Sequence, residues 1–151
     1  MPQESFVAAI NRDKECTLAR PATLEGTSLH TGEKVTLTIK PAPGGHGLKF
    51  RRIDLPDQPL IEADVARVET VERATTLASG SVRVHTVEHV LSALSGMGVD
   101  NALVEMDANE PPIGDGSAQP FVQLIKKAGL EEQDHPRKTW EIREPLHFDS
   151  K

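Results

Sequence analysis

Two short segments carry the apolar stripe of an amphipathic helix, and a glycine follows each stripe. Their apolar residues recur at positions i, i+3, i+4 and i+7, which is the spacing of one helix face. The first stripe consists of Val87, Val90, Leu91 and Leu94, and the second of Phe121, Leu124, Ile125 and Ala128. The glycine stops are Gly96 and Gly129, and Ser117 can cap the second helix. Both helices therefore need an apolar surface to pack against.

The other apolar residues favour short strands. From Val35 to Ile39 apolar and threonine residues alternate, which predicts a strand with one buried face. Weaker strand patterns cover residues 16–24, where Pro21 interrupts, and 48–53, 61–65, 75–78 and 102–106. The first of these can form a hairpin with Val35–Ile39. We predict an α+β fold, a two-layer sandwich of one mainly antiparallel sheet with both helices packed on one face.

The 151 residues suffice for one domain. We expect a polar N-terminal tail over residues 1–15, the α+β domain over 16–130 and a charged linker over 131–137. Alternation resumes at Lys138–Arg143, with no later segment to pair with it. Residues 138–151 are therefore expected to be the first strand of a second domain that is otherwise missing.

Composition excludes several classes of protein. The net charge is −6 and no basic run is interleaved with aromatic residues, so nucleic acid is not an expected partner. Cys16 is the single cysteine, which rules out an internal disulfide and a cysteine-rich metal site. No stretch has the roughly 18 consecutive apolar residues of a transmembrane segment, and the first residues lack the basic start of a signal peptide. We expect a cytoplasmic protein.

The first helix has a polar side with metal-binding chemistry. His89 lies opposite the apolar stripe on a helical wheel, and His85, Glu88 and Ser92 share its side. Imidazole is a common zinc ligand, and a carboxylate beside the metal can take a proton from water. Residues 85–89 also match H-x-x-E-H, the motif of inverted zinc proteases. Such a protease needs a further acidic zinc ligand on a later helix, and the second helix has no acidic residue. A solvated polar helix face is the plainer alternative.

Several further motifs follow one another along the chain. They are Leu29-His30-Thr31-Gly32, Pro41-Ala42-Pro43, Phe50-Arg51-Arg52-Ile53-Asp54-Leu55, Thr75-Thr76-Leu77, Thr86-Val87-Glu88-His89, Gly98-Val99-Asp100-Asn101 and Ile113-Gly114-Asp115-Gly116-Ser117. In these motifs and their spacing, from about Thr17 to Phe148, the chain resembles the UDP-3-O-acyl-N-acetylglucosamine deacetylase family. The resemblance implies a zinc-dependent amidohydrolase of lipid A synthesis in Gram-negative bacteria, which releases acetate from its UDP-sugar substrate.

The resemblance also implies roles for individual residues. His89 would be a zinc ligand and Glu88 the general base that activates water. His30 and Asp115 would lie near the active site. Two positions depart from the family pattern, because relatives usually carry a serine-like residue at His85 and methionine at Gly114. The departure at His85 suggests that the protease motif is accidental.

Part of the family's zinc site has no counterpart in the sequence. Members of the family have two domains with the active site between them, and the second domain supplies a histidine and an aspartate four positions later. None of the six histidines has an aspartate at that spacing. A catalytic zinc usually has three protein ligands, so we expect this chain to be inactive alone and to need the second domain in cis. The alternative is a non-catalytic, truncated domain that only binds a partner domain.

Overall fold

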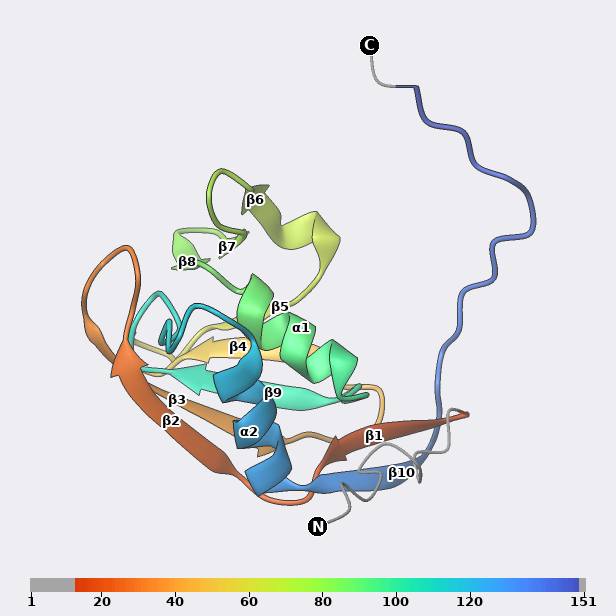
Figure 1. Ribbon diagram of the computed structural model, residues 1–151, viewed down its shortest axis with the longest axis horizontal. Coiled ribbons are helices and arrows are strands. Elements are labelled where there is room, and N and C mark those ends of the chain that lie inside the picture. The colour runs from red at the N-terminus through yellow and green to blue at the C-terminus, as the bar shows by residue number, and fades with distance from the viewer. Residues whose placement is uncertain (1–12, 150–151) are drawn as a thin grey trace.

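The computed structural model describes residues 13–149, so most of the predicted tail lies outside the described residues. The last two residues of the predicted tail are not a tail, because Lys14 and the buried Glu15 begin strand β1 (Lys14–Leu18). The largest sheet has five strands in the order β2-β3-β9-β4-β5 (Figure 1). These strands are β2 (Ala22–Thr27), β3 (Lys34–Pro41), β4 (Leu48–Arg52), β5 (Leu60–Glu62) and β9 (Ala102–Met106). Neighbouring strands are antiparallel except β4 and β9, which run parallel. Val35, Leu37 and Ile39 are buried, which confirms the alternation predicted for this strand.

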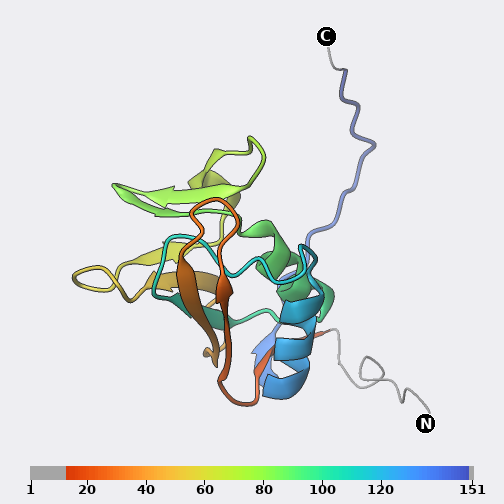
Figure 2. The same cartoon turned by 60° about the vertical axis from the view of Figure 1, so that its left-hand side comes forward.

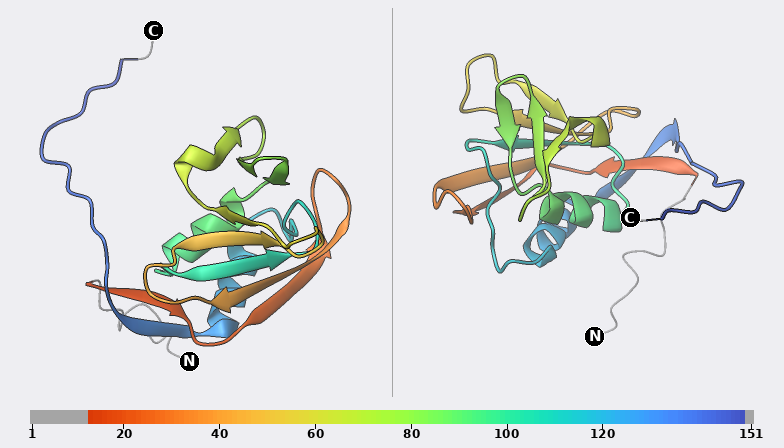
Figure 3. Two further views of the ribbon diagram at one scale, coloured as in Figure 1. Left: turned by 180° about the vertical axis from the view of Figure 1, so that it is seen from behind. Right: turned by 90° about the horizontal axis from the view of Figure 1, so that it is seen from above.

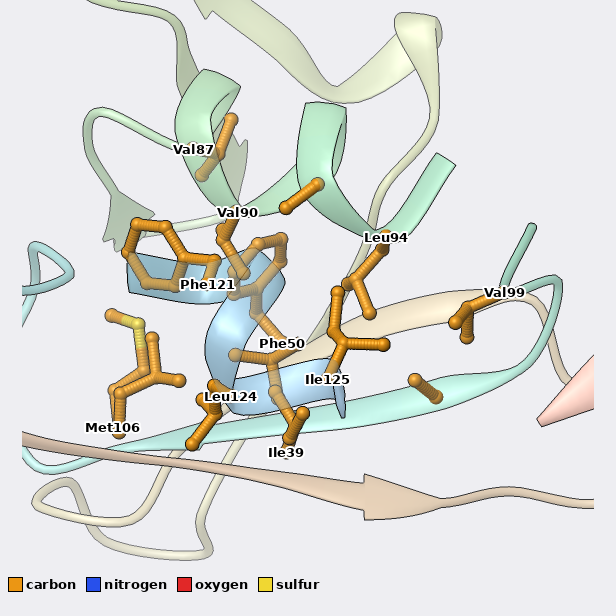
Figure 4. Close-up of a cluster of buried hydrophobic side chains, with 14 of the residues drawn as sticks. Ile39, Phe50, Val87, Val90, Leu94, Val99, Met106, Phe121, Leu124 and Ile125 are labelled. Atoms are coloured by element: carbon orange, nitrogen blue, oxygen red, sulfur yellow. The ribbon is translucent and has the colours of Figure 1, made fainter. Parts of the chain in front are cut away.

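The helices α1 (Glu88–Gly96) and α2 (Gln119–Ala128) pack side by side on one face of this sheet (Figures 1 and 2). Their apolar stripes meet the sheet in one core, where Phe121 and Ile125 of α2 lie close to Phe50 of β4 (Figure 4). Burying each such side chain contributes about 1.5–3 kcal/mol. The predicted α+β class, with both helices on one face of a sheet, is confirmed.

The prediction of a single sheet is wrong, because two smaller sheets flank the five-stranded one (Figure 3). One pairs β1 (Lys14–Leu18) with β10 (Leu130–Pro136), and the other contains β6 (Val68–Thr70), β7 (Thr76–Ser79) and β8 (Val82–Val84). Between β5 and β6 lies a short 3₁₀ helix, η1 (Val65–Arg67). Proline has no N–H for a ladder, and the strand predicted across Pro21 divides there. Its second half, β2, forms the predicted hairpin with β3.

Most of the segment 131–137, predicted as a linker, forms strand β10 against β1. Its charged residues alternate with Gln133 and His135, which are partly buried. The Gln133 amide accepts a hydrogen bond from Asn101 Nδ2 at 2.8 Å and donates one to the Ala42 carbonyl at 2.8 Å. The inward face of β10 is therefore polar and is anchored by the hydrogen bonds of Gln133, a pattern that apolar periodicity does not reveal.

The strand predicted at Lys138–Arg143 does not form, and residues 137–149 have no regular secondary structure. Within the described chain no strand pairs with residues 138–143, and an unpaired strand leaves its backbone groups without partners. Trp140 is 97% exposed as a result. That this segment begins a second domain stays a prediction. Within residues 13–149, no helix has the length and apolarity required to cross a membrane.

Candidate functional site

The first residues of α1 are Glu88 and His89, and both are partly buried. Val90 and Leu94 of the same helix are fully buried, so His89 lies off the apolar stripe as predicted. Glu88 Oε2 accepts a hydrogen bond from the Thr75 backbone N–H at 3.0 Å. This bond holds one carboxylate oxygen against the segment before β7, while Oε1 has no hydrogen-bond partner among the described residues.

His85 does not share a helical turn with His89. The helix begins only at Glu88, and Thr86 has a φ of +54°, which breaks the helical path between the two histidines. The His85 Nδ1 atom lies 2.9 Å from Thr76 Oγ1, and the His85 backbone N–H donates to the Asn109 carbonyl at 2.7 Å. The arrangement predicted for the first turn of a helix is therefore wrong, and the helical geometry of an inverted zinc protease is not present.

His30 lies in the loop between β2 and β3. The Ser28 N–H donates to the Glu33 carbonyl at 2.9 Å and Gly32 has a φ of +69°, so the chain reverses direction in a tight turn. The His30 backbone N–H donates to Glu110 Oε2 at 2.9 Å. His30 Nδ1 lies 2.7 Å from Glu110 Oε1. The turn thus places His30 against a carboxylate from a distant part of the sequence.

Glu110 is a fully buried carboxylate that sequence reasoning missed. Thr86 Oγ1 donates to its Oε1 at 2.7 Å, and the Thr31 N–H lies 3.3 Å from its Oε2. Burial favours a raised pKa, but the hydrogen bonds from Thr86, His30 and Thr31 outweigh it and hold the pKa of Glu110 below its ordinary value of 4.5. The sequence marks Glu110 only by its place between the predicted strand 102–106 and two prolines, which indicates the end of a strand and no functional role.

A cavity of about 410 Å³ opens beside this carboxylate. His30 and Glu110 form part of its wall. The other side is formed by Thr76 of β7, His85 directly after β8, Glu69 of β6 and Glu72 in the loop after β6. Asn109 also lines it, and its buried Oδ1 has no hydrogen-bond partner among the described residues. The predicted residues Glu88, His89 and Asp115 are not part of the wall.

Asp115 lies in the loop before α2 and is exposed. Its Oδ1 accepts hydrogen bonds from the Ser117 N–H at 2.9 Å and the Ser117 hydroxyl at 2.7 Å, and these bonds lower the pKa of Asp115. The Ser117 hydroxyl in turn accepts from the N–H of Gln119, the first residue of α2, at 3.1 Å. The structure therefore gives Asp115 a turn-forming role, and its proximity to an active site stays a prediction.

Gly114 stands where the family resemblance implies methionine. Its φ is +58°, and a Cβ at this position would lie 2.7 Å from Pro120 Cγ. A side chain would therefore require the loop or Pro120 to move, which explains why glycine suits this chain.

The donor atoms that zinc would need are present only in part. No group of three or more His, Cys, Asp or Glu residues within the described chain is placed to hold a metal ion. His89 supplies one imidazole, and Glu88 beside it supplies a carboxylate with one unpartnered oxygen. This set fits one ligand and one base of a catalytic zinc site, whose remaining ligands would have to come from outside these residues.

Comparison with known proteins agrees with the family resemblance of the sequence motifs. The sequence model of the family described as UDP-3-O-acyl N-acetylglycosamine deacetylase matches residues 15–151. UDP-3-O-acyl-N-acetylglucosamine deacetylases with similar sequences include those of Pseudomonas entomophila, 54% identical over 125 residues, and Methylococcus capsulatus, 48% identical over 136 residues. The alignments cover 83% and 90% of this chain but 41% and 45% of those relatives. The chain thus spans less than half the length of the relatives it matches.

Proposed function

The chain belongs to the UDP-3-O-acyl N-acetylglycosamine deacetylase family, and on this premise we propose that it is the N-terminal part of a zinc-dependent deacetylase. The complete protein would hydrolyse the acetamide of UDP-3-O-acyl-N-acetylglucosamine and release acetate, a step of lipid A synthesis. The observation that carries the proposal is the placement of Glu88 and His89 at the start of α1, within a chain that matches the family over residues 15–151. A cytoplasmic location stays a prediction.

We assign separate roles to the two residues at the start of α1. His89 is the zinc ligand that this chain contributes, since its imidazole lies off the apolar stripe and is partly exposed. When bound, zinc supplies a Lewis acid and makes a water molecule more acidic. Glu88 is the general base. Its Oε2 is held by the Thr75 N–H, which leaves Oε1 to take the proton from the attacking water and pass it to the leaving amine.

The experiment begins with the gene. The DNA beyond the Lys151 codon is sequenced, and the protein encoded by the full reading frame is assayed for acetate release from UDP-3-O-acyl-N-acetylglucosamine. A continued frame that encodes a His-x-x-x-Asp segment and an active product is the expected result. A stop codon directly after Lys151, together with no acetate release, would overturn the deacetylase proposal and favour a domain that only binds a partner.

Glu88→Gln tests the base in the complete protein. The glutamine keeps an oxygen that can accept from the Thr75 N–H, so the start of α1 should keep its structure. Loss of a general base lowers kcat by about 10²–10⁴-fold, while bound zinc, measured by metal analysis, should stay at the wild-type level. Glu62→Gln on the exposed edge strand β5 is the matched control, with an expected activity close to wild type. Near-normal activity of Glu88→Gln would show that another group takes the proton.

A further inference from the structure

The Glu110 carboxylate has no role in the proposed chemistry, yet it is completely buried. A buried carboxylate is costly unless hydrogen-bond donors surround it. Four groups lie within hydrogen-bond distance of its oxygens: the backbone N–H groups of His30 and Thr31 and the Thr86 hydroxyl, which donate, and the ring nitrogen Nδ1 of His30. All four come from two segments, the loop after β2 and the residues just before α1. Glu110 therefore joins two segments that flank the candidate site.

The Thr86 hydrogen bond acts on the start of α1. Thr86 is buried and has a φ of +54°, a conformation that a β-branched residue rarely adopts. Its hydroxyl donates to Glu110 Oε1 at 2.7 Å, and the helix starts two residues later with Glu88 and His89. The carboxylate thus helps to hold the backbone turn from which both candidate residues extend.

The His30 hydrogen bond fixes where the ring carries a proton. An ionised carboxylate can only accept hydrogen bonds, and the hydrogen bonds to Glu110 keep its pKa low, so it is ionised at neutral pH. The nitrogen 2.7 Å from it, His30 Nδ1, must therefore carry a proton. His30 Nε2 has no hydrogen-bond partner among the described residues, and the ring lines the cavity with 44% of its side chain exposed.

We propose that Glu110 is a positioning residue of the deacetylase site: it holds His30 with the proton on Nδ1, so that Nε2 is free for a ligand in the cavity, and it holds Thr86 in the turn that starts α1. The role in catalysis rests on the proposed function, whereas the protonation of His30 does not. The unpartnered Asn109 Oδ1 in the same wall adds an acceptor beside His30. The two atoms suit a ligand that presents hydroxyl or N–H groups, as a sugar does.

Nuclear magnetic resonance on the 151-residue chain tests the protonation directly. The histidines are labelled with ¹⁵N, and ring nitrogen–proton correlations are recorded above about pH 8, where an ordinary imidazole is neutral. The His30 signals are identified by their loss in His30→Gln. The expected wild-type result is a proton on Nδ1. A wild-type His30 with its only ring proton on Nε2 would overturn the proposal, and this result needs no variant of Glu110.

Glu110→Gln should reverse the His30 tautomer. The backbone N–H groups of His30 and Thr31 can only donate, so the amide oxygen must replace Oε2. The amide NH₂ then faces His30 Nδ1 and Thr86, which makes Nδ1 an acceptor and moves the ring proton to Nε2. Glu105→Gln is the matched control, since Glu105 is a largely buried carboxylate on β9 that pairs with Lys40 and Arg51. It should leave the His30 tautomer unchanged, and an unchanged tautomer in Glu110→Gln would contradict the proposal.

Kinetics of the complete deacetylase test the catalytic part. Glu110→Gln should lower kcat by on the order of 10- to 100-fold, the scale expected when reacting groups lose their orientation, whereas Glu105→Gln should keep the wild-type kcat. If the wild-type protein releases no acetate, the proposed function fails and the NMR result still decides the protonation of His30. If Glu88→Gln is inactive but Glu110→Gln has the wild-type kcat, the positioning role in the reaction is wrong and the proposed function stands.

Discussion

Glu15 and Glu110 are two buried carboxylates at opposite ends of the same strands. Glu15 Oε2 accepts from the Gly45 N–H at 2.7 Å, shortly after β3 ends, and from Asn101 Nδ2 at 2.6 Å, just before β9 begins. Glu110 follows the end of β9 and binds the loop before β3. Burial favours a raised pKa for each carboxyl, but hydrogen bonds prevail and the pKa is lowered in both.

The two carboxylates differ in their partners. Asn101, which donates to Glu15, is itself buried and joins β1 and β10 to the five-stranded sheet. Glu110 binds His30, which is partly exposed in a cavity, and Thr86, which is strained. A buried carboxylate with a lowered pKa can therefore be purely structural. Glu15 also has a partly exposed histidine beside it, because His135 Nδ1 lies 3.2 Å from its Oε2 and 40% of that side chain is exposed. The strain of Thr86, just before α1, is therefore what distinguishes the surroundings of Glu110.

Removing both carboxylate oxygens of Glu110 or of Glu15 is expected to have the largest effect on stability. Glu110→Ala leaves the donors on Thr86, His30 and Thr31 without an acceptor, and should lower the free energy of unfolding by about 3 kcal/mol. Glu15→Ala removes the acceptor for Gly45 and Asn101 and should cost about 2 kcal/mol. Urea unfolding is followed by circular dichroism, because Trp140 is 97% exposed and makes a poor fluorescence reporter.

The exposed Glu62→Ala is the control for both variants. Glu62 forms an ion pair with Lys49 at 3.6 Å, and an exposed pair of this kind contributes about 0–1 kcal/mol. If the proposed function holds, the two carboxylates should also differ in their effect on catalysis, and Glu15→Gln should keep the wild-type kcat of the complete protein. A Glu110→Ala variant as stable as Glu62→Ala would break the comparison.

Acid should weaken both ends of the sheet through the same mechanism. The pKa values of Glu15 and Glu110 are lower in the folded chain than the ordinary 4.5, so these groups stabilise the fold above about pH 4.5. That stabilisation is lost as the pH falls through the lowered values, at about 1.4 kcal/mol for each unit of difference. Urea unfolding at a series of pH values between about 6 and 3 should show a flatter pH dependence for Glu15→Gln and Glu110→Gln than for the wild type. An identical slope would mean that these carboxylates are not linked to folding.

Much of the fold could be predicted from the sequence because it follows from periodicity. Alternation along β3 and the stripes of α1 and α2 identify elements whose apolar side chains form the core. The separate pairing of β1 with β10 could not be predicted this way, because β10 is held by polar contacts such as those of Gln133. Polar side chains carry no periodic signal of which face is buried.

The positions of the candidate site residues could be predicted only where a motif marked them. Glu88 and His89 stand at the start of α1, and His89 lies off the apolar stripe, as the helical wheel indicated. Glu110 had no motif, since its role depends on His30 and Thr86, which lie 80 and 24 residues away in the sequence. The positive φ of Thr86 was equally hidden, because threonine gives no sign of a left-handed conformation.

The smallest expected effect isolates the strain at Thr86. Four described residues other than glycine have a positive φ, namely Asp57, Gln58, Arg73 and Thr86, and Thr86 alone is β-branched. Thr86→Ala and Thr86→Gly both lose the hydroxyl that binds Glu110, so the difference between them reports the backbone. Because glycine adopts this conformation freely, Thr86→Gly should be more stable than Thr86→Ala by about 1 kcal/mol. At Thr36 on the extended strand β3 the order should reverse, with glycine less stable by about 0.5–1 kcal/mol. Urea unfolding of the four variants measures both differences, and a Thr86→Ala variant more stable than Thr86→Gly would show that the turn before α1 stores no strain for Glu110 to hold.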